Sequence, residues 1–464
     1  MKPITQPKKI LIQRADRLGD VICTLPVIDA LQKKFPNTQL DYLTSSIGST
    51  FLKSHKYLKK IHTLEIKNNQ IKEKKALVNL LKKETYDVYL SLWNHPSLAK
   101  LGVEAKIPNR IGDKTNIPAR FYYTHPIRQW WEDYNRHQIE FNMDLLQPFN
   151  IQSQLKPGQI TIPENDLEWA RNCLQICSNK KPLVIFTGTG GTNHPIPETA
   201  VKTFIEKISA EHHWHIILAG QQTPNSLFNQ YQHPNVLNLL GKTTLFQLMG
   251  IIHERHAFIG PDTGPTHLAS FMQKPLIVFS SMKPNPPNRW GPLSPHFNIM
   301  RQEYNCPYPC FKQCHPQECF SFVTPELLTQ HFNKLCKAIN SQKPYNTEQI
   351  KTQHRLYSLR VLYIYKNKTE QQQLAPIIEK FNQQGLRIFA TQPPKNTKGY
   401  IDLVIKHNIN ILQGNISKLT STIIGLYMGV ICAYTKPQKC HLPLTPKTTL
   451  ETLLASYKTI FNSP

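Results

Sequence analysis

The sequence predicts an α/β protein with two parallel-sheet halves and a smaller third stretch. Short apolar runs alternate with segments of helical periodicity from the first residues onward. This alternation stops in a polar, proline-bearing segment at 148–163, restarts, and stops again in a polar segment at 341–355. Such alternation is typical of strand–helix–strand units with parallel strands. We therefore expect three domains, at residues 1–162, 163–340 and 341–464.

The first half begins with a strand and a helix. Lys9–Gln13 is an apolar run of strand length, and Asp20–Phe35 follows with apolar residues at helical spacing. Two later runs, Leu40–Thr44 and Val88–Leu92, have the length of buried strands. We expect these runs to form one parallel sheet.

The second half repeats the pattern after a helix expected near Asn165–Cys177. Its expected strands are Leu183–Phe186, His215–Ala219, Ala257–Gly260 and Leu276–Phe279, and its expected helices are Pro197–Ser209, Leu245–His253, His267–Met272 and Pro325–Ile339. Two such halves place the carboxyl ends of their strands face to face across a cleft, where ligands bind in open α/β sheets.

The third stretch has the pattern of a smaller, degenerate α/β module. Its expected strands are Val361–Tyr365, Leu386–Ala390, Asp402–Lys406 and Val430–Tyr434, with a helix at Leu374–Gln383. The run from Gly414 to Pro437 faintly repeats the run from Gly260 to Pro284, because both read helix, apolar strand and Lys-Pro.

The composition sets further bounds. The chain has 464 residues, of which 40% are hydrophobic, and 55 Lys and Arg against 30 Asp and Glu give a net charge of +25. That charge attracts polyanions such as nucleic acid, anionic lipid headgroups or phosphorylated glycolipid, although solubility alone is an alternative explanation. No run approaches the ~20 apolar residues that cross a bilayer, and the first residues lack a signal-peptide core. We therefore expect a cytoplasmic protein.

The motif directly after the first strand carries a candidate catalytic carboxylate. It reads Arg14-Ala15-Asp16-Arg17-Leu18-Gly19-Asp20-Val21, with Gly19 allowing a tight turn and Asp20 at the expected helix start. A carboxylate in this place can remove a proton from an incoming hydroxyl. The alternative is that Asp20 only caps the helix, because Asp is a preferred N-cap residue.

Two turns of the second half are candidates for binding phosphate. The first follows Phe186 and offers Thr187, Gly188, Thr189, Gly190 and Thr192, small residues that let backbone amides approach a phosphate. Its glycines miss the dinucleotide spacing, so an ordinary structural turn stays open. In the second, Asp262, Thr263 and Gly264 open a helix that carries His267, which suits a diphosphate leaving group. A buried His267 that only caps its own loop is the alternative.

Taken in order and spacing, these motifs resemble the heptosyltransferases of lipopolysaccharide assembly, glycosyltransferase family nine. The resemblance runs from about residue 8 to 339. Its matching pieces are Arg14, Leu18–Val21, Thr24–Pro26, Arg110–Gly112, His137, Glu140, Asn142, Leu145–Leu146, Leu240–Leu245, Gly260–Ala269 and Trp290–Pro292.

The resemblance implies a GT-B fold and an inverting, metal-independent transfer of heptose from an ADP-sugar to the inner core of lipopolysaccharide. It makes Asp20 the general base and assigns donor diphosphate contacts to Asp262, Thr263, Gly264 and His267. Thr243, within the matching piece Leu240–Leu245, is a further candidate for binding the nucleotide-sugar. The implied acceptor is an anionic glycolipid of the Kdo-lipid A or core type. That acceptor places the protein at the cytoplasmic face of the inner membrane, with no nucleic acid as partner.

Two donor-side positions depart from the family pattern. His194 stands where a phosphate-contacting Lys is expected, and Gln221 and Gln222 follow Gly220 where an acidic residue is usual. A neutral His does not offset diphosphate charge as Lys does. The alternative function is therefore a binding scaffold at the inner membrane that keeps the transferase fold without its donor chemistry.

Two remaining groups are candidates for acceptor and metal binding. We expect the anionic acceptor to meet Arg14, Arg17, Arg110, Arg120 and Arg128, the last three within a stretch rich in aromatic residues that stack on sugars. A solvated basic loop or single-stranded nucleic acid fits the same composition. Thiolates of Cys306, Cys310, Cys314 and Cys319 are candidate ligands of a structural zinc. The alternatives are reduced cysteines that pack in the core and, least favoured in a reducing compartment, a disulfide.

Overall fold

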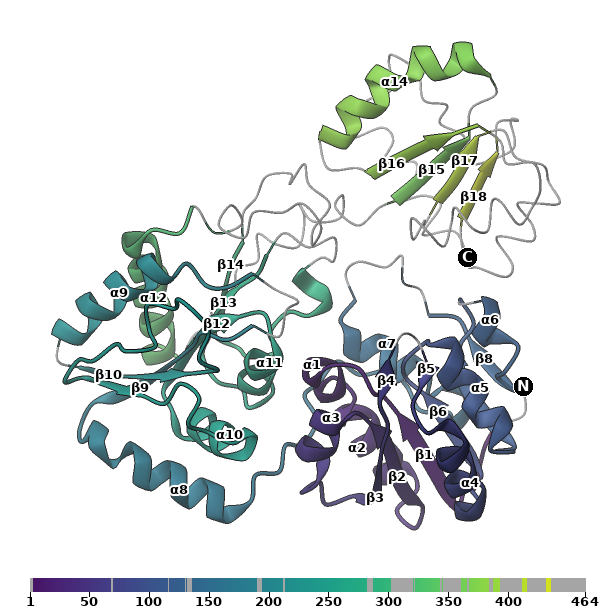
Figure 1. Ribbon diagram of the computed structural model, residues 1–464, viewed down its shortest axis with the longest axis horizontal. Coiled ribbons are helices and arrows are strands. Elements are labelled where there is room, and N and C mark those ends of the chain that lie inside the picture. Colours follow the sequence, from purple (N-terminus) through teal and green to yellow (C-terminus); the bar gives the residue numbers. More distant parts are fainter. Residues whose placement is uncertain are drawn as a thin grey trace.

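Within the residues that it describes, the computed structural model contains two six-stranded sheets, a four-stranded sheet and a small hairpin (Figure 1). It describes residues 3–67, 70–115, 117–129, 131, 136–189, 194–211, 213–281, 287–301, 320, 322–342, 344, 360–364, 367–383, 387–392, 411–414 and 431–434. Each sheet collects strands that are close in sequence, so the chain builds one sheet before it starts the next.

The first sheet has the strand order β3-β2-β1-β6-β7-β8, and all its pairs are parallel. Its strands are β1 Lys9–Gln13, β2 Gln39–Thr44, β3 Leu58–Thr63, β6 Val88–Ser91, β7 Asn109–Asp113 and β8 His125–Ile127, and β4 Ile66–Lys67 pairs with β5 Gln70–Ile71 as the antiparallel hairpin. Ile10, Leu11 and Ile12 of β1 are fully buried. A central parallel strand is covered on both faces, which explains its continuous apolar run.

The helices of this half include one departure from the sequence prediction. They are α1 Leu18–Ile22, α2 Leu25–Lys34, α3 Ser46–Leu52, α4 Lys74–Glu84, α5 Pro96–Glu104, α6 Ile117–Arg120 and α7 Gln138–Asp144. The expected single helix Asp20–Phe35 is wrong, because the chain breaks at Cys23 and Thr24. Pro26 cannot continue a helix from the residues before it, but it is well suited to the first turn of α2.

The second sheet has the order β11-β10-β9-β12-β13-β14, again with parallel pairs only. Its strands are β9 Lys181–Phe186, β10 Trp214–Ala219, β11 Val236–Asn238, β12 Ala257–Pro261, β13 Leu276–Phe279 and β14 Phe297–Met300; its helices are α8 Glu164–Leu174, α9 Glu198–Ala210, α10 Leu245–Glu254, α11 Gly264–Phe271 and α12 Pro325–Asn340. Apart from the hairpin, both halves therefore share one strand order. In each, the order reverses beside the first strand.

The third sheet has the order β16-β15-β17-β18 and is parallel throughout. Its elements are β15 Arg360–Ile364, α14 Lys368–Gln383, β16 Arg387–Thr391, β17 Ile411–Gly414 and β18 Ile431–Tyr434. The order matches the central part of the second sheet, β10-β9-β12-β13, which agrees with the faint repeat in the sequence. The strand expected at Asp402–Lys406 lies outside the described residues.

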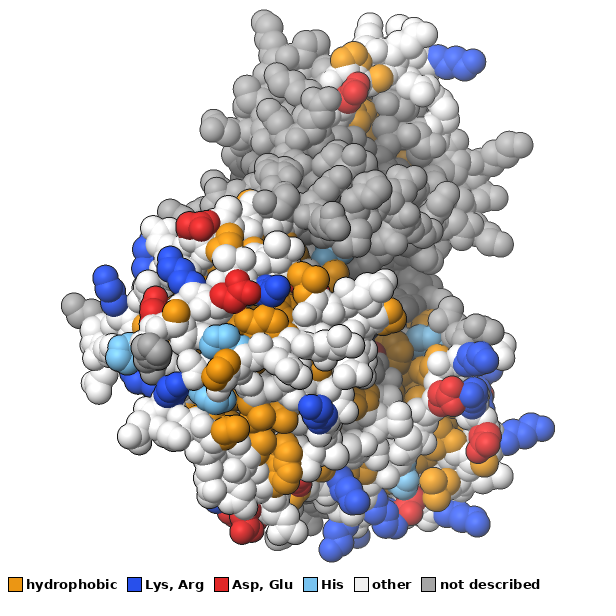
Figure 2. Space-filling model, turned by 60° about the vertical axis from the view of Figure 1, so that its left-hand side comes forward, with side chains coloured by type: hydrophobic (Ala, Val, Ile, Leu, Met, Phe, Trp, Pro, Cys, Tyr) orange, Lys and Arg blue, Asp and Glu red, His pale blue; other side chains and the backbone are white. Residues whose placement is uncertain are grey.

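Basic side chains lie in several separate groups on the face shown in Figure 2, around and between hydrophobic ones. Within the described residues, no helix has the length and apolar character needed to cross a membrane.

Candidate active site

The candidate site lies where the two large sheets turn their carboxyl edges toward each other. In the first half, the strand order reverses between β1 and β6, and Arg14 to Asp20 follow β1. In the second half, it reverses between β9 and β12, and Asp262 to Gly264 lie at the end of β12. Loops at such reversals splay apart, which is why open α/β sheets bind ligands there. The topology therefore selects the same two segments that the sequence singled out.

Asp20 is held by a buried arginine. Arg14 Nη2 lies 2.6 Å from Asp20 Oδ1 and 2.7 Å from Asp16 Oδ2, and Arg14 Nε donates to Asp16 Oδ1 at 2.8 Å. Nη1 of the same guanidinium donates to the carbonyl oxygen of Leu92, which follows β6. Although burial opposes it, the two carboxylates raise the pKa of Arg14 above its ordinary value. Arg14 is therefore a fixed cation that joins the ends of β1 and β6 and orients Asp20.

The Asp20 side chain keeps one oxygen available. Its exposed fraction is 16%, and among the described residues no hydrogen bond or ion pair involves Oδ2. The helix α1 has Arg17 as its N-cap residue, without a side-chain cap bond. Asp20 therefore lies inside the first turn and is not the N-cap residue, and its role as a base stays a prediction.

The turn after β12 opens helix α11. Thr263 is the N-cap residue of α11, and the first bond of the helix runs from His267 N to Thr263 O, at 3.1 Å. The amides of Gly264 and Thr266 precede that bond, and amides in a first helical turn point outward toward any anion placed there. His267 Nε2 lies 3.5 Å from Asp262 Oδ1, so the carboxylate orients the ring.

Helices α1 and α11 pack against each other and bring the two halves into contact (Figure 1). A Cβ atom at Gly19 would lie 2.6 Å from Cδ2 of His267, and one at Gly264 would lie 2.9 Å from a methyl group of Leu18. Both glycines are therefore needed for the close approach of these helices. Burial raises the pKa of the Cys23 thiol beneath them, and the charges of Asp20 and Asp262 both add to that shift.

A histidine from the first half bridges to the second. His137 is the N-cap residue of α7, where Nδ1 accepts from Ile139 N and Glu140 completes a capping box. Nε2 lies 3.1 Å from Gly291 O, so Nε2 carries the proton and donates to this carbonyl. Burial lowers the pKa of His137 to about 3, and His267 adds to the shift. His137 is therefore a neutral bridge beside the candidate site.

A second bridge lies next to it. The guanidinium of Arg289 stacks over the rings of Trp131 and Phe141, at 4.7 and 4.3 Å from their centroids. Those two rings stack on each other with centroids 4.6 Å apart. Cation–π contacts of this kind hold the second half onto the first.

The comparisons with known proteins agree with this geometry. The family model of glycosyltransferase family 9 (heptosyltransferase) matches residues 75–320. The chain belongs to glycosyltransferase family 9.

Individual members of family 9 and related structures are similar over most of their own length. A putative glycosyltransferase of Haemophilus influenzae is 24% identical over 303 residues, 62% of this chain and 86% of the relative. Lipopolysaccharide heptosyltransferase 3 of Escherichia coli is 24% identical over 275 residues, 56% of this chain and 79% of the relative. The structure of E. coli ADP-heptose lps heptosyltransferase II has a TM-score of 0.59 at 19% identity and covers 72% of this chain and 99% of that one. The protein is therefore a glycosyltransferase with the GT-B fold.

The structure places several of the predicted donor residues. Thr187 and Gly188 follow β9 and lie against the turn at Gly220, which has a φ of +130°. A Cβ atom added at Gly220 would lie 2.9 Å from Gly188 N, so the two turns pack tightly against each other. Thr189 and His194 are described, whereas Gly190 and Thr192 lie outside the described residues. Thr243 directly precedes Thr244, the N-cap residue of α10. The contacts of these residues with a nucleotide-sugar donor stay predictions.

The predicted acceptor arginines differ from one another. Arg17 is exposed one turn before Asp20, which suits an acceptor contact, and Arg128 directly follows β8. Arg120 lies over the ring of Phe121, which is 67% exposed. Arg110 instead donates to the carbonyl oxygens of Ile107 and Tyr122, and Arg14 is buried against Asp16 and Asp20. Through these contacts Arg110 supports the backbone and Arg14 holds the two carboxylates. The contacts do not support the predicted acceptor role of either arginine.

Several residues around the site escaped the sequence analysis as functional residues. Asp16, His137 and Arg289 are examples: Asp16 stood in the quoted motif and His137 among the matching pieces, but nothing local showed what they contact. The Cys306, Cys310, Cys314 and Cys319 group lies outside the described residues.

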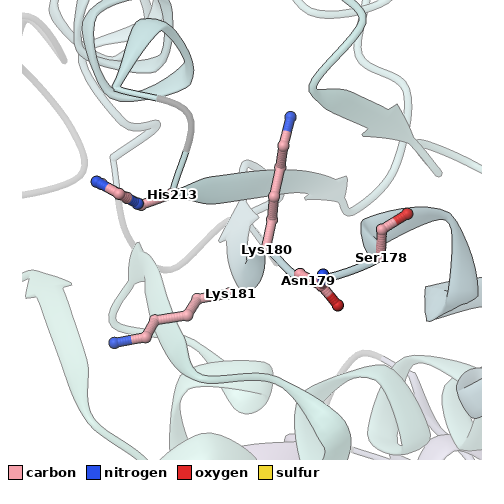
Figure 3. A pocket seen from close by; sticks show the side chains of 5 residues that line it. All are labelled: Ser178, Asn179, Lys180, Lys181 and His213. Atoms are coloured by element: carbon pink, nitrogen blue, oxygen red, sulfur yellow. The ribbon is translucent and has the colours of Figure 1, made fainter.

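A surface hollow of about 460 Å³ lies elsewhere (Figure 3). Its lining residues are Ser178, Asn179, Lys180, Lys181 and His213, at the starts of β9 and β10. This is the edge of the second sheet opposite Thr187 and Gly188. The hollow is therefore remote from the candidate site, and we assign the reaction to the carboxyl edges.

Proposed function

We propose that this protein transfers a heptose, or a related sugar, from an ADP-sugar to the inner core of lipopolysaccharide, with inversion at the anomeric carbon. The observation that carries the proposal is the contact between α1 and α11. It sets a carboxylate held by Arg14 beside a helix N-terminus that can receive a diphosphate. Names of similar proteins support the substrates, since they include lipopolysaccharide heptosyltransferases and a heptosyltransferase with an ADP-heptose analogue.

The proposed reaction is a single displacement. Asp20 Oδ2 removes the proton of the acceptor hydroxyl, the acceptor oxygen bonds to the anomeric carbon, and the bond from that carbon to the diphosphate oxygen breaks. As this bond breaks, negative charge develops on the diphosphate of the departing ADP. The amides of Gly264 and Thr266 at the N-terminus of α11 stabilise that charge. Asp262 repels phosphate, so we assign it to orienting His267 and to accepting bonds from sugar hydroxyls. The step requires no metal, since protein groups supply both the base and the positive potential.

The proposal includes a division of labour. Residues 1–162 hold the acceptor near Arg17, Arg120 and Arg128, and residues 163–340 hold the donor. The acceptor chemistry places the enzyme at the cytoplasmic face of the inner membrane, where the excess of basic side chains favours binding.

The decisive experiment is Asp20→Asn in a transfer assay with ADP-heptose and Kdo-lipid A, read by mass spectrometry. We expect kcat to fall by ~10²–10⁴-fold, the loss expected on removing a positioned base. Binding of ADP, measured by calorimetry, should not weaken, because Asp20 makes none of the proposed donor contacts and its replacement removes a negative charge near the diphosphate. Asp29→Asn is the matched control, since Asp29 bonds to Gln159 N on the same half, away from α11.

The outcomes separate the two candidate functions. An Asp20→Asn enzyme within a few-fold of wild type would refute Asp20 as the base. A wild-type protein that binds no ADP would favour the scaffold function instead, because a transferase needs its donor.

A further inference from the structure

The carboxylate pair at the end of β1 has a member that the proposed reaction does not use. Asp16 occupies two nitrogens of Arg14: Oδ1 accepts from Nε at 2.8 Å, and Oδ2 lies 2.7 Å from Nη2. The first contact is a hydrogen bond and the second is an ion pair. Nη2 also donates to Asp20 Oδ1, at 2.6 Å. One guanidinium therefore serves two carboxylates, and it contacts Asp16 through two nitrogens and Asp20 through one.

A purely local role does not account for Asp16. The N-cap residue of α1 is Arg17, and no side chain caps that helix. The backbone carbonyl of Asp16 accepts from Ser45 Oγ, but its carboxylate turns back to Arg14. Its side chain is only 16% exposed, so the Asp16 carboxylate is largely removed from solvent where it contacts Arg14.

We propose that Asp16 is a positioning residue that aims Arg14 at Asp20 and offsets the charge of the arginine, so that Asp20 stays basic enough to accept the proton. The inference rests on the proposed function, because it takes Asp20 as the base. With Asp16 in place, Arg14 is already neutralised when Asp20 takes up the proton. Without Asp16, the full charge of Arg14 would act on Asp20, stabilise its ionised form and weaken it as a base.

Titratable groups from several elements surround the two carboxylates. Arg14, directly after β1, Tyr42 of β2 and Cys23 at the end of α1 interact with both. From the second half, Asp262 interacts with Cys23, and His267 lies against Gly19. Burial raises the pKa of Asp16 to about 6; Arg14 opposes this shift, and Asp20 adds to it.

The test compares pH profiles of kcat for wild type, Asp16→Asn and Asp16→Glu, with Asp29→Asn as control. Asp16→Asn should move the acid limb down by about one pH unit, because an adjacent negative charge is lost. Its plateau kcat should fall by roughly three- to tenfold, since a weaker base transfers the proton less readily. KM should change little. Asp16→Glu, which restores the charge, should move the acid limb back toward wild type.

An acid limb in Asp16→Asn that superimposes on wild type would overturn the proposal, even if the overall rate were lower. If Asp16→Asn does not fold, ¹³C-carboxylate NMR of wild-type protein decides: coupled, two-step titration of Asp16 and Asp20 supports the proposal, and independent single steps overturn it. Failure of the proposed function looks different, because then Asp20→Asn itself retains transfer.

Discussion

Replacing Gly19 by alanine tests the contact that joins the two halves. The added Cβ would lie 2.6 Å from Cδ2 and 3.2 Å from Nε2 of His267. Carbon atoms in contact stay about 3.5–4.0 Å apart, so the ring or helix α1 has to move by roughly 1 Å. The His267 side chain is 8% exposed and lies beside Asp262 and the ring of Trp290, which leaves little room to turn.

Such a displacement should affect the reaction more than the fold. Overpacking of this kind costs about 1–3 kcal/mol of unfolding free energy. A misplacement of about 1 Å at a reacting centre lowers the rate by about 10²-fold. We therefore expect Gly19→Ala to lose about 10²-fold in kcat while it still folds. The transfer assay gives kcat, and urea unfolding gives the stability.

Gly102→Ala is the matched control. Its Cβ would lie 2.7 Å from Cδ1 of Tyr89, a similar crowding, but in α5 of the first half and outside the α1–α11 contact. It should lose comparable stability with little change in kcat. Wild-type kcat in Gly19→Ala, or an equal loss of kcat in Gly102→Ala, would refute the reasoning.

Three further predictions concern stability. Arg255 is 3% exposed, and none of its guanidinium nitrogens has a hydrogen-bond partner among the described residues; its guanidinium lies over the ring of Phe258, 5.9 Å from the centroid. Arg255→Met should therefore raise the unfolding free energy by about 2 kcal/mol or more in urea titrations, and a loss would mean that the guanidinium binds a group in solution. The pKa of His137 is lowered by burial from 6.5 to about 3. Between these two pH values the unfolded chain is protonated at His137 and the folded chain is not. Stability should therefore be complete above about pH 6.5 and decline down to about pH 3, by up to ~1.4 kcal/mol per unit from this group, and His137→Gln should show a shallower decline than wild type; equal slopes would contradict this. Gly220→Ala should destabilise by about 1 kcal/mol or more, because φ is +130° and Gly188 N would lie 2.9 Å from the new Cβ; unchanged stability would mean that this turn relaxes freely.

Much of the element order was predictable because strands and helices leave local signals. Lys9–Gln13 and Leu276–Phe279 are strands with the predicted bounds, since a continuous apolar run of that length is typical of a buried parallel strand. The merged helix at Asp20–Phe35 shows the limit of periodicity. The apolar spacing continues through Thr24 without a break. In the structure, however, the Thr24 hydroxyl bonds to Val21 O and Tyr42 OH, and helix α2 begins at the next residue.

The short outer strands were harder to predict. β3 Leu58–Thr63 and β14 Phe297–Met300 have mixed polarity because they lie at sheet edges, so no apolar run marks them. Their place in the sheet depends on pairing with residues far along the chain, which a local pattern does not contain.

By itself, the sequence determined the alternation of elements, the place of Asp20 and Thr263 at helix starts, and the family. These follow from hydrophobic period and turn chemistry, which act over a few residues. Only the tertiary structure decided that Arg14 serves Asp16 and Asp20 together, that Gly19 faces His267 and that Arg110 supports the backbone. Such contacts join segments that are up to about 250 residues apart, and they are set by which strands are adjacent in each sheet and by how closely two helices can pack.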